Sequence, residues 1–154
     1  MANKYYIAYG SNLNLAQMRR RCPGAAVAGT TVLDGFRLLF RGSGTGAYLT
    51  IEPWEGGKVP AAVWEVSEEN EKSLNRYEGF PTFYRKETMK LKVKLDRSGK
   101  TRTLEGFVYI MNEGRPLGAP SGAYLRTCAH GYQNFGFDPR ILLDACSNSE
   151  EVAS

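Results

Sequence analysis

The stretch YYIAYGSNLN, residues 5–14, changes character halfway along its length. Its first half is apolar or aromatic and predicts a buried strand, whereas the residues from Gly10 to Asn12 favour a turn with exposed backbone N–H groups. Asn14 can then cap a short helix over residues 15–21. A turn between a strand and a helix attracts an anion such as a carboxylate, although a plain connection would leave the same pattern.

Length and composition are those of an ordinary globular protein. The 154 residues suffice for one core, and 42% hydrophobic with 23% charged residues argues against disorder. We expect a single domain over residues 1–146 and a frayed C-terminal tail over residues 147–154. No segment resembles a signal peptide or a membrane span, so we expect a cytoplasmic protein without a membrane partner.

Strand patterns dominate the middle of the chain. The alternating runs FYRKETMKLKVKL and TRTLEGFVYIM flank the turn sequence DRSGK, and together they predict a hairpin over residues 83–111. Residues 25–42 predict extended structure with a bend at Asp34-Gly35. Further strands are predicted at AYLTI and VPAAVWEV.

Helix signals occur near both ends and once in the middle. Ser67 and Ser121 suit the caps of helices over residues 68–76 and 121–135, and Asp138-Pro139 opens a last short helix. Because strands and helices do not alternate regularly, the sequence predicts an α+β domain with a mainly antiparallel sheet. Curled sheets of this size often close into a barrel.

Several common catalytic sets are missing from the sequence. His130 is the single imidazole, and it lies two residues from Cys128 on a predicted helix, so the two side chains point in different directions. Ser-His-Asp and Cys-His catalysis therefore lack a base. Cys22, Cys128 and Cys146 are widely spaced, which favours reduced thiols over disulfides or a zinc site. We expect neither a metal nor a cofactor.

Two other features could suggest phosphate or nucleic-acid binding. GSGTG, residues 42–46, precedes a strand, whereas a phosphate-binding loop opens a helix, so we interpret it as a flexible hairpin that could still rim a site. The net charge of +4 comes from dispersed basic residues. The lysines from Lys86 to Lys94 favour a solvated edge strand, because a nucleic-acid surface would interleave aromatic residues. We expect no nucleic-acid partner.

The remaining candidate for chemistry is Glu78, in NRYEGFPTFY. Its neighbours are aromatic or apolar, whereas Glu68, Glu69 and Glu71 lie in the first turn of the predicted helix and read as solvated. An apolar pocket raises the pKa of a carboxyl group and makes it a useful base near neutral pH. A glutamate before a glycine at a helix end is also common without any function.

Four segments in this order resemble the γ-glutamylcyclotransferase family, which includes AIG2-like proteins and γ-glutamylamine cyclotransferases: YIAYGSNLN, GAYLTIEP, YEGFPTFYRK and GAPSGAYLRTCAHGYQNFG. They run from residue 4 to about residue 145. Y-G-S-N after an N-terminal strand, with E-G downstream, is the most specific part. The resemblance implies a small mixed, mainly antiparallel β-barrel flanked by helices, with the Y-G-S-N loop and the carboxylate in one pocket.

The resemblance also implies roles for individual residues. Glu78 would be the general acid and base, and Tyr84 and Tyr124 would line the pocket. Leu49 is bulkier than the residue that relatives often carry there, which bears on substrate choice. The α-carboxylate and amine of a γ-glutamyl group would be bound by the loop and the strand beneath it, which comprise Tyr6, Ile7, Ala8, Tyr9, Gly10, Ser11 and Asn12.

The implied reaction needs no enzyme nucleophile. The α-amine of a γ-glutamyl compound attacks its own γ-carbonyl and closes a five-membered lactam, which yields 5-oxoproline and a free amine or amino acid. No basic cluster marks a leaving-group site, so the sequence predicts γ-glutamyl amines or small γ-glutamyl amino acids as substrates in preference to glutathione. The alternative is a non-catalytic ligand-binding or interaction domain of the same fold. The sequence assigns no oligomeric state.

Overall fold

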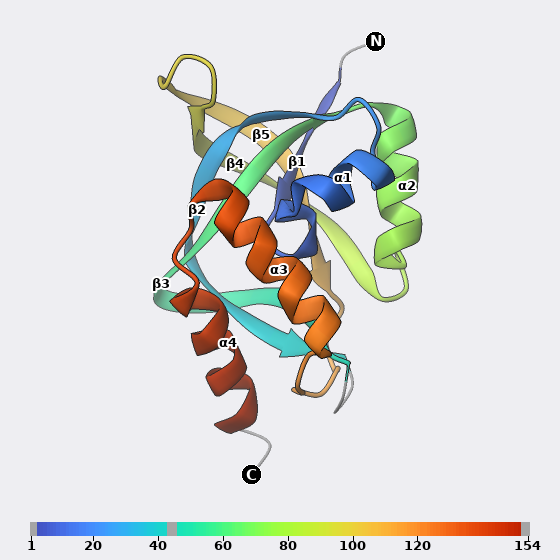
Figure 1. Ribbon diagram of the computed structural model, residues 1–154, viewed down its shortest axis with the longest axis vertical. Helices are drawn as coiled ribbons and strands as arrows, with labels where there is room; N and C mark the ends of the chain where they lie inside the picture. The colour runs from blue at the N-terminus through green and yellow to red at the C-terminus, as the bar shows by residue number, and fades with distance from the viewer. Residues whose placement is uncertain (1–2, 43–45, 152–154) are drawn as a thin grey trace.

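The apolar half of YYIAYGSNLN forms strand β1 (Lys4–Ala8), whose last three residues are buried. β1 runs antiparallel to β3 (Tyr48–Val66) and parallel to β5 (Thr101–Met111), and it thereby closes the sheet into a barrel. The computed structural model describes residues 3–42 and 46–151. Figure 1 shows the resulting mixed, mainly antiparallel barrel with helices around it, which confirms the predicted α+β fold.

Two long hairpins complete the barrel in the order β1-β3-β2-β4-β5. β4 (Tyr84–Leu95) and β5 form the hairpin that the alternating runs predict. β2 (Ala26–Arg41) pairs with β3 along most of its length, and the register shifts at the predicted bend, where Gly35 has a φ of 82°. β2 reaches β4 only around Gly29, where a Cβ would lie 2.1 Å from the Lys94 carbonyl oxygen. Glycine therefore permits the closure.

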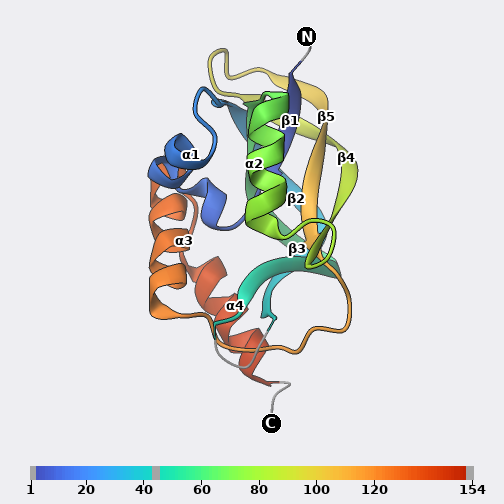
Figure 2. The ribbon, with the colours of Figure 1, turned by 90° about the vertical axis from the view of Figure 1, so that its right-hand side faces the viewer.

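The predicted caps start three of the helices. Asn14 Oδ1 accepts from the Gln17 N–H and begins α1 (Leu15–Arg21), after the short 3-10 helix η1 (Ser11–Leu13). Ser67 caps α2 (Glu68–Glu78) and Ser121 caps α3 (Gly122–Phe135) in the same way. Figure 2 shows α2 along one side of the barrel, with α1 and α3 beside it. Within the described residues, no helix is long and apolar enough to cross a membrane.

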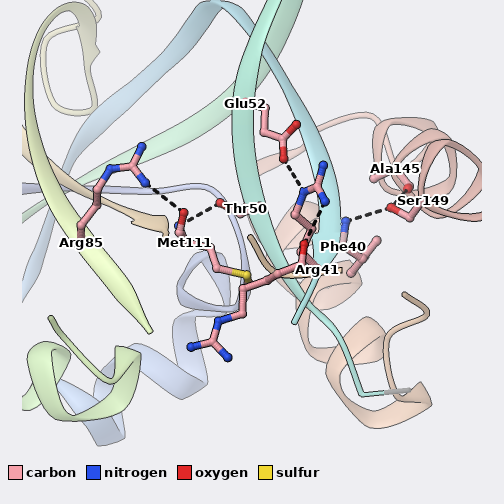
Figure 3. A network of polar contacts seen from close by, with 9 residues as sticks. Phe40, Arg41, Thr50, Glu52, Arg85, Met111, Ala145 and Ser149 are labelled. Atoms are coloured by element: carbon pink, nitrogen blue, oxygen red, sulfur yellow. Dashed lines mark hydrogen bonds and ion pairs between the residues drawn. The ribbon is translucent and has the colours of Figure 1, made fainter. Parts of the chain in front are cut away.

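The C-terminal helix α4 (Arg140–Glu151) corrects the prediction of a frayed tail from residue 147. Ser149 is only 1% exposed, and its hydroxyl donates to the Ala145 carbonyl at 2.6 Å. Ser149 Oγ also accepts a hydrogen bond from the Phe40 N–H at 2.9 Å, as Figure 3 shows. Because β4 has left β2 at this level, the Phe40 N–H needs an acceptor outside the sheet. Residues 152–154 of the predicted tail lie outside the described residues.

Polar contacts join β3 to β5 beyond the end of β1. The Met111 N–H donates to Thr50 Oγ1 at 3.0 Å, and Arg85 donates to the Met111 carbonyl at 3.0 Å. Arg41 of β2 forms an ion pair with Glu52 of β3 (Figure 3). These contacts hold the barrel wall in place where main-chain pairing with β1 has stopped, next to the loop that follows β1.

Candidate active site

The YGSN loop (Tyr9–Asn12) follows β1 directly and leads into η1. Its backbone lies against the starts of β3 and α3. A Cβ at Gly10 would be 3.5 Å from Leu49 Cδ1 and 3.5 Å from Tyr124 Oη, which are ordinary contact distances. The loop therefore packs directly on both elements, although they come from distant parts of the sequence.

Hydrogen bonds fix two side chains of the YGSN loop. Ser11 Oγ lies 2.9 Å from Tyr77 Oη on α2. Asn12 Nδ2 donates to Tyr6 Oη at 2.9 Å, and Asn12 Oδ1 accepts from the Arg21 guanidinium. Ser11 and Asn12 are both buried. The loop is thus held by the first strand, the first helix and α2 together.

Glu78 is the last residue of α2, and Gly79 ends the helix in the left-handed conformation, with a φ of 64°. Glycine adopts this conformation without strain, so the chain leaves the helix immediately after Glu78. Glu78 then lies beside the YGSN loop in the wall of one cavity. Among the described residues it has no hydrogen-bonding or ion-pair partner.

Burial raises the pKa of Glu78 from 4.5 to about 7, and the nearby Arg21 guanidinium opposes this shift. A carboxyl group with this pKa can accept a proton and return it at neutral pH. Burial, and after it the charge of Glu78, also raises the pKa of Tyr6 and of Tyr9. Both phenols therefore stay protonated beside Glu78.

The cavity has a volume of about 350 Å³. The predicted site residues in its wall are Tyr6, Ile7, Tyr9, Gly10, Ser11, Asn12, Glu78, Tyr84 and Tyr124. Ala8 does not line it, because it is 1% exposed and pairs with Ala62 of β3. Of the GSGTG hairpin that was predicted to rim a site, residues 43–45 lie outside the described residues.

Tyrosine hydroxyls bind the backbone at the cavity wall. Tyr84 Oη donates to the Leu49 carbonyl at 2.7 Å, and Tyr124 Oη accepts from the Leu49 N–H at 3.1 Å. Tyr9 Oη donates to the Tyr109 carbonyl at 2.6 Å. Leu49 is therefore held between the two predicted lining tyrosines, and its bulk occupies part of the cavity.

Sequence reasoning missed part of this wall, which also includes Tyr48, Arg76, Tyr77 and Tyr109. A signal existed for Tyr109, because a tyrosine in an apolar strand needs a partner for its hydroxyl. That partner is Asn75 Oδ1 at 2.7 Å. Sequence reasoning assigned Arg21 no role, yet its guanidinium lies 3.4 Å from the centre of the Tyr77 ring.

The first turn of α2 also differs from the prediction. Glu71 was interpreted as solvated, but it is 9% exposed and pairs with Lys86 at 2.6 Å and with Lys4 at 2.9 Å. Burial alone would raise the pKa of Glu71, but hydrogen bonds from Lys86 and Lys4 lower it below its ordinary value. Lys86 is likewise not a solvated edge residue, because its ammonium lies 4.4 Å from the centre of the Phe80 ring.

The described part of the chain contains neither a cluster of metal ligands nor a Cys-His pair. No group of three His, Cys, Asp or Glu side chains there could hold a metal ion. Cys128 is buried and His130 is exposed, so the two side chains diverge along α3. The cavity with the YGSN loop and Glu78 is therefore the site that the observations favour.

Comparison with known proteins identifies the family of the chain. The family described as gamma-glutamyl cyclotransferase, AIG2-like, matches residues 6–126, which include both the YGSN loop and Glu78. The chain belongs to this family. The match confirms the resemblance seen in the sequence. Among curated proteins, none matches the chain significantly.

Solved structures show the same fold. A structure described as a gamma-glutamyl cyclotransferase is 25% identical, with a TM-score of 0.71 over 96% of this chain and 86% of that one. An uncharacterized protein from Homo sapiens is 26% identical, with a TM-score of 0.72 over 100% and 88%. An AIG2-like protein from Mus musculus, 20% identical, has a TM-score of 0.58 over 81% and 84% and supports the cyclotransferase fold alone.

Proposed function

We propose that this member of the family is an enzyme that cyclises the γ-glutamyl group of a small substrate to 5-oxoproline and releases an amine or amino acid. One observation carries the proposal: Glu78, with a pKa of about 7 and no partner among the described residues, lies in the same cavity as the YGSN loop. A binding domain for an anionic ligand would gain nothing from a second carboxylate there.

In the proposed reaction, Glu78 moves two protons, one after the other, from the α-nitrogen of the substrate to the leaving nitrogen. Its carboxylate takes a proton from the α-ammonium group of the substrate, and the freed amine attacks the γ-carbonyl carbon. The new C–N bond closes the ring, and the bond from the γ-carbon to the leaving nitrogen breaks as Glu78 returns the proton to that nitrogen. Glu78 then takes the second proton from the ring nitrogen, which leaves a neutral lactam, and passes it to the released amine, which departs as an ammonium. Water is not consumed, and the pKa of about 7 suits both transfers.

The YGSN loop holds the other end of the substrate in this proposal. Backbone N–H groups and the side chains of Ser11 and Asn12 bind the α-carboxylate, and Tyr84 and Tyr124 enclose the folded chain. Holding the amine close to the γ-carbonyl supplies much of the rate, because the attack is intramolecular. Tyr6 and Ile7 form the floor beneath the loop, and Ala8 supports them from within the barrel.

The cavity favours a small leaving group. Its volume of about 350 Å³ is at the lower end of the range for ligand pockets, and Leu49 fills part of the wall. Arg76 adds one positive charge to the lining, and it is exposed to solvent. We therefore keep γ-glutamyl amines and small γ-glutamyl amino acids as the proposed substrates, in preference to glutathione.

A substrate panel tests the proposal. The purified protein is incubated with γ-glutamyl amines, γ-glutamyl dipeptides and glutathione, and 5-oxoproline is measured by mass spectrometry. We expect 5-oxoproline from at least one small member. Glutathione as the best substrate would refute the preference alone, whereas no 5-oxoproline from any member would support a non-catalytic binding domain.

A further inference from the structure

The cavity wall contains an unusual number of phenols: Tyr6, Tyr9, Tyr48, Tyr77, Tyr84, Tyr109 and Tyr124. A phenol has a single proton to donate, so each existing hydrogen bond decides whether that proton is available to a ligand. Tyr9 and Tyr84 donate to backbone carbonyls, and Tyr109 donates to Asn75. The protons of these three hydroxyls are already used by the protein.

The remaining phenols differ in position. Tyr48 is 45% exposed, and Tyr77 shares its hydrogen bond with Ser11. Tyr124 accepts an N–H and lies beside the thiol of Cys128, which can accept its proton. Tyr6, which is 4% exposed, also accepts an N–H, and its own proton has no acceptor within the described residues.

Arg21 determines the direction of the hydrogen bonds that reach Tyr6. A guanidinium group can only donate, so Asn12 must accept from Arg21 through Oδ1 and must turn Nδ2 toward Tyr6. The Tyr6 oxygen is then an acceptor for Asn12, and its proton must point elsewhere. The Arg21 guanidinium is held in place by two contacts. Its Nη2 donates to Gln17 Oε1 at 2.9 Å, and it lies over the Tyr77 ring.

The ring of Tyr6 is equally well held. It stacks on Phe107 with centroids 5.4 Å apart and meets the edge of Tyr109 at 5.8 Å. Tyr6 lines the cavity near Glu78, whose charge is the second largest cause of the raised pKa of Tyr6. A phenol that stays protonated and cannot rotate away is a preorganised donor.

We propose that Tyr6 is a catalytic residue that donates its hydroxyl proton to the γ-carbonyl oxygen of the substrate, and that Arg21, acting through Asn12, is a positioning residue for that donor. The inference rests on the proposed function. Glu78 must reach both nitrogen atoms that bond to the γ-carbon, so a donor next to Glu78 lies near the oxygen on the same carbon. The hydrogen bond strengthens as negative charge develops on that oxygen.

Tyr6→Phe tests the donor, because it removes the hydroxyl and keeps the stacked ring. We expect kcat to fall by about 10²–10³-fold, with KM changed by less than about threefold, as for loss of one oxyanion donor. Tyr132→Phe is the matched control, since Tyr132 is fully buried outside the cavity and its hydroxyl has no partner among the described residues. It should leave kcat unchanged. Melting curves by circular dichroism show whether both variants fold.

A second set of variants tests the positioning role. Arg21→Gln replaces a pure donor by an amide that can also accept, so kcat on the high-pH plateau should fall by about tenfold. Arg21→Lys, which is again a pure donor, should restore most of it. In the Tyr6→Phe background, Arg21→Gln should cause no further loss on the plateau, because the group that it positions is already gone.

The outcomes separate this inference from the proposed function. If the wild-type protein forms 5-oxoproline and Tyr6→Phe retains its kcat, Tyr6 is not the donor, although the proposed function stands. If Arg21→Gln costs the same factor with and without the Tyr6 hydroxyl, Arg21 does not act through Tyr6. A wild-type protein that forms no 5-oxoproline overturns both proposals.

Discussion

The two ends of α2 carry glutamates whose pKa values are shifted in opposite directions. Glu71 and Glu78 lie two helical turns apart, so both side chains project from the same face. Glu71 is paired with Lys86 and Lys4, and these lysines lower its pKa. Glu78 has no such partner among the described residues, and burial raises its pKa to about 7. The same residue type is ionised and paired at one end of the helix, whereas at the other end it has a raised pKa and no partner among the described residues.

The difference shows that burial and pairing have separate consequences. A buried carboxylate with a cation nearby keeps its charge and ties two elements together, here α2 to β4 and β1. A buried carboxyl group without an ion-pair partner keeps its proton to a higher pH and costs stability when it ionises. Arg21 is close enough to moderate the pKa of Glu78 without forming an ion pair with it. The proposed reactivity of Glu78 therefore depends on the absence of a cation that pairs with its carboxylate among the described residues.

The largest expected difference is in turnover. Glu78→Gln removes the group that moves the proton and preserves its shape, so we expect kcat for 5-oxoproline formation to fall by at least about 10³-fold. Glu71→Gln should stay within about threefold of wild type, because it lies outside the cavity wall. Both variants are assayed well below their melting temperatures. Equal losses in the two variants would remove the distinction between the two ends of α2.

The second expected difference is in how stability depends on pH. The pKa of Glu78 is raised on folding, so its contribution is present at low pH and is lost as pH rises from about 4.5 to about 7. Over that range Glu78→Gln should gain about 3 kcal/mol relative to wild type, an order-of-magnitude figure. Urea unfolding at several pH values measures the difference.

Glu71 provides the opposite sign in the same experiment. Its pKa is lowered on folding, so its contribution is present above the unfolded pKa and is lost as pH falls through the folded pKa. The stability that Glu71→Gln loses at neutral pH should therefore shrink in acid. Parallel pH profiles for the two variants would show that the environments of Glu71 and Glu78 do not differ.

This contrast was only half visible in the sequence. The aromatic context of YEGFP correctly indicated a carboxyl group with a raised pKa at Glu78. The acidic run EENEK suggested solvation at Glu71, because Lys86, its main partner, belongs to a strand that begins after the helix has ended. Tertiary pairing of this kind leaves no local pattern. The polar sequence of the tail likewise gave no sign that Ser149 is buried, because its partner Phe40 is distant in the sequence.

The barrel was easier to predict than the details of its pocket. Alternation and turn residues identified the β4–β5 hairpin, and cap residues located the starts of α1, α2 and α3. The YGSN loop and Glu78 were recognised as a pair. Sequence reasoning missed Tyr109, which lines the cavity from β5, and Arg21, which contacts the Tyr77 ring from the end of α1. Both lie far from Glu78 in the sequence, and only the closed barrel brings them close to it. Ala8 was predicted to bind as part of the unbroken run from Tyr6 to Asn12, but its side chain is buried in the core and does not line the cavity.

The third expected difference concerns the cation at the paired end. Lys86→Met keeps the aliphatic stem among the rings near Phe80 but leaves the largely buried Glu71 with one partner, and we expect a loss of about 2 kcal/mol. Urea unfolding at pH 7 measures it. The double variant Glu71→Gln with Lys86→Met should lose less than the sum of the single losses, since neither group then keeps an unpaired charge. Strict additivity would show that the two residues act independently.

The smallest expected effect belongs to Lys4, the second partner of Glu71. Its side chain is 64% exposed, so solvent screens the ion pair, whereas the Lys86 side chain is 20% exposed. We expect Lys4→Ala to cost less than about 1 kcal/mol, and to cost still less in 0.5 M salt. The loss for Lys86→Met should change little with salt, because its pair with Glu71 is screened by protein. A Lys4→Ala loss as large as that of Lys86→Met, and independent of salt, would mean that β1 anchors the start of α2 as strongly as β4 does.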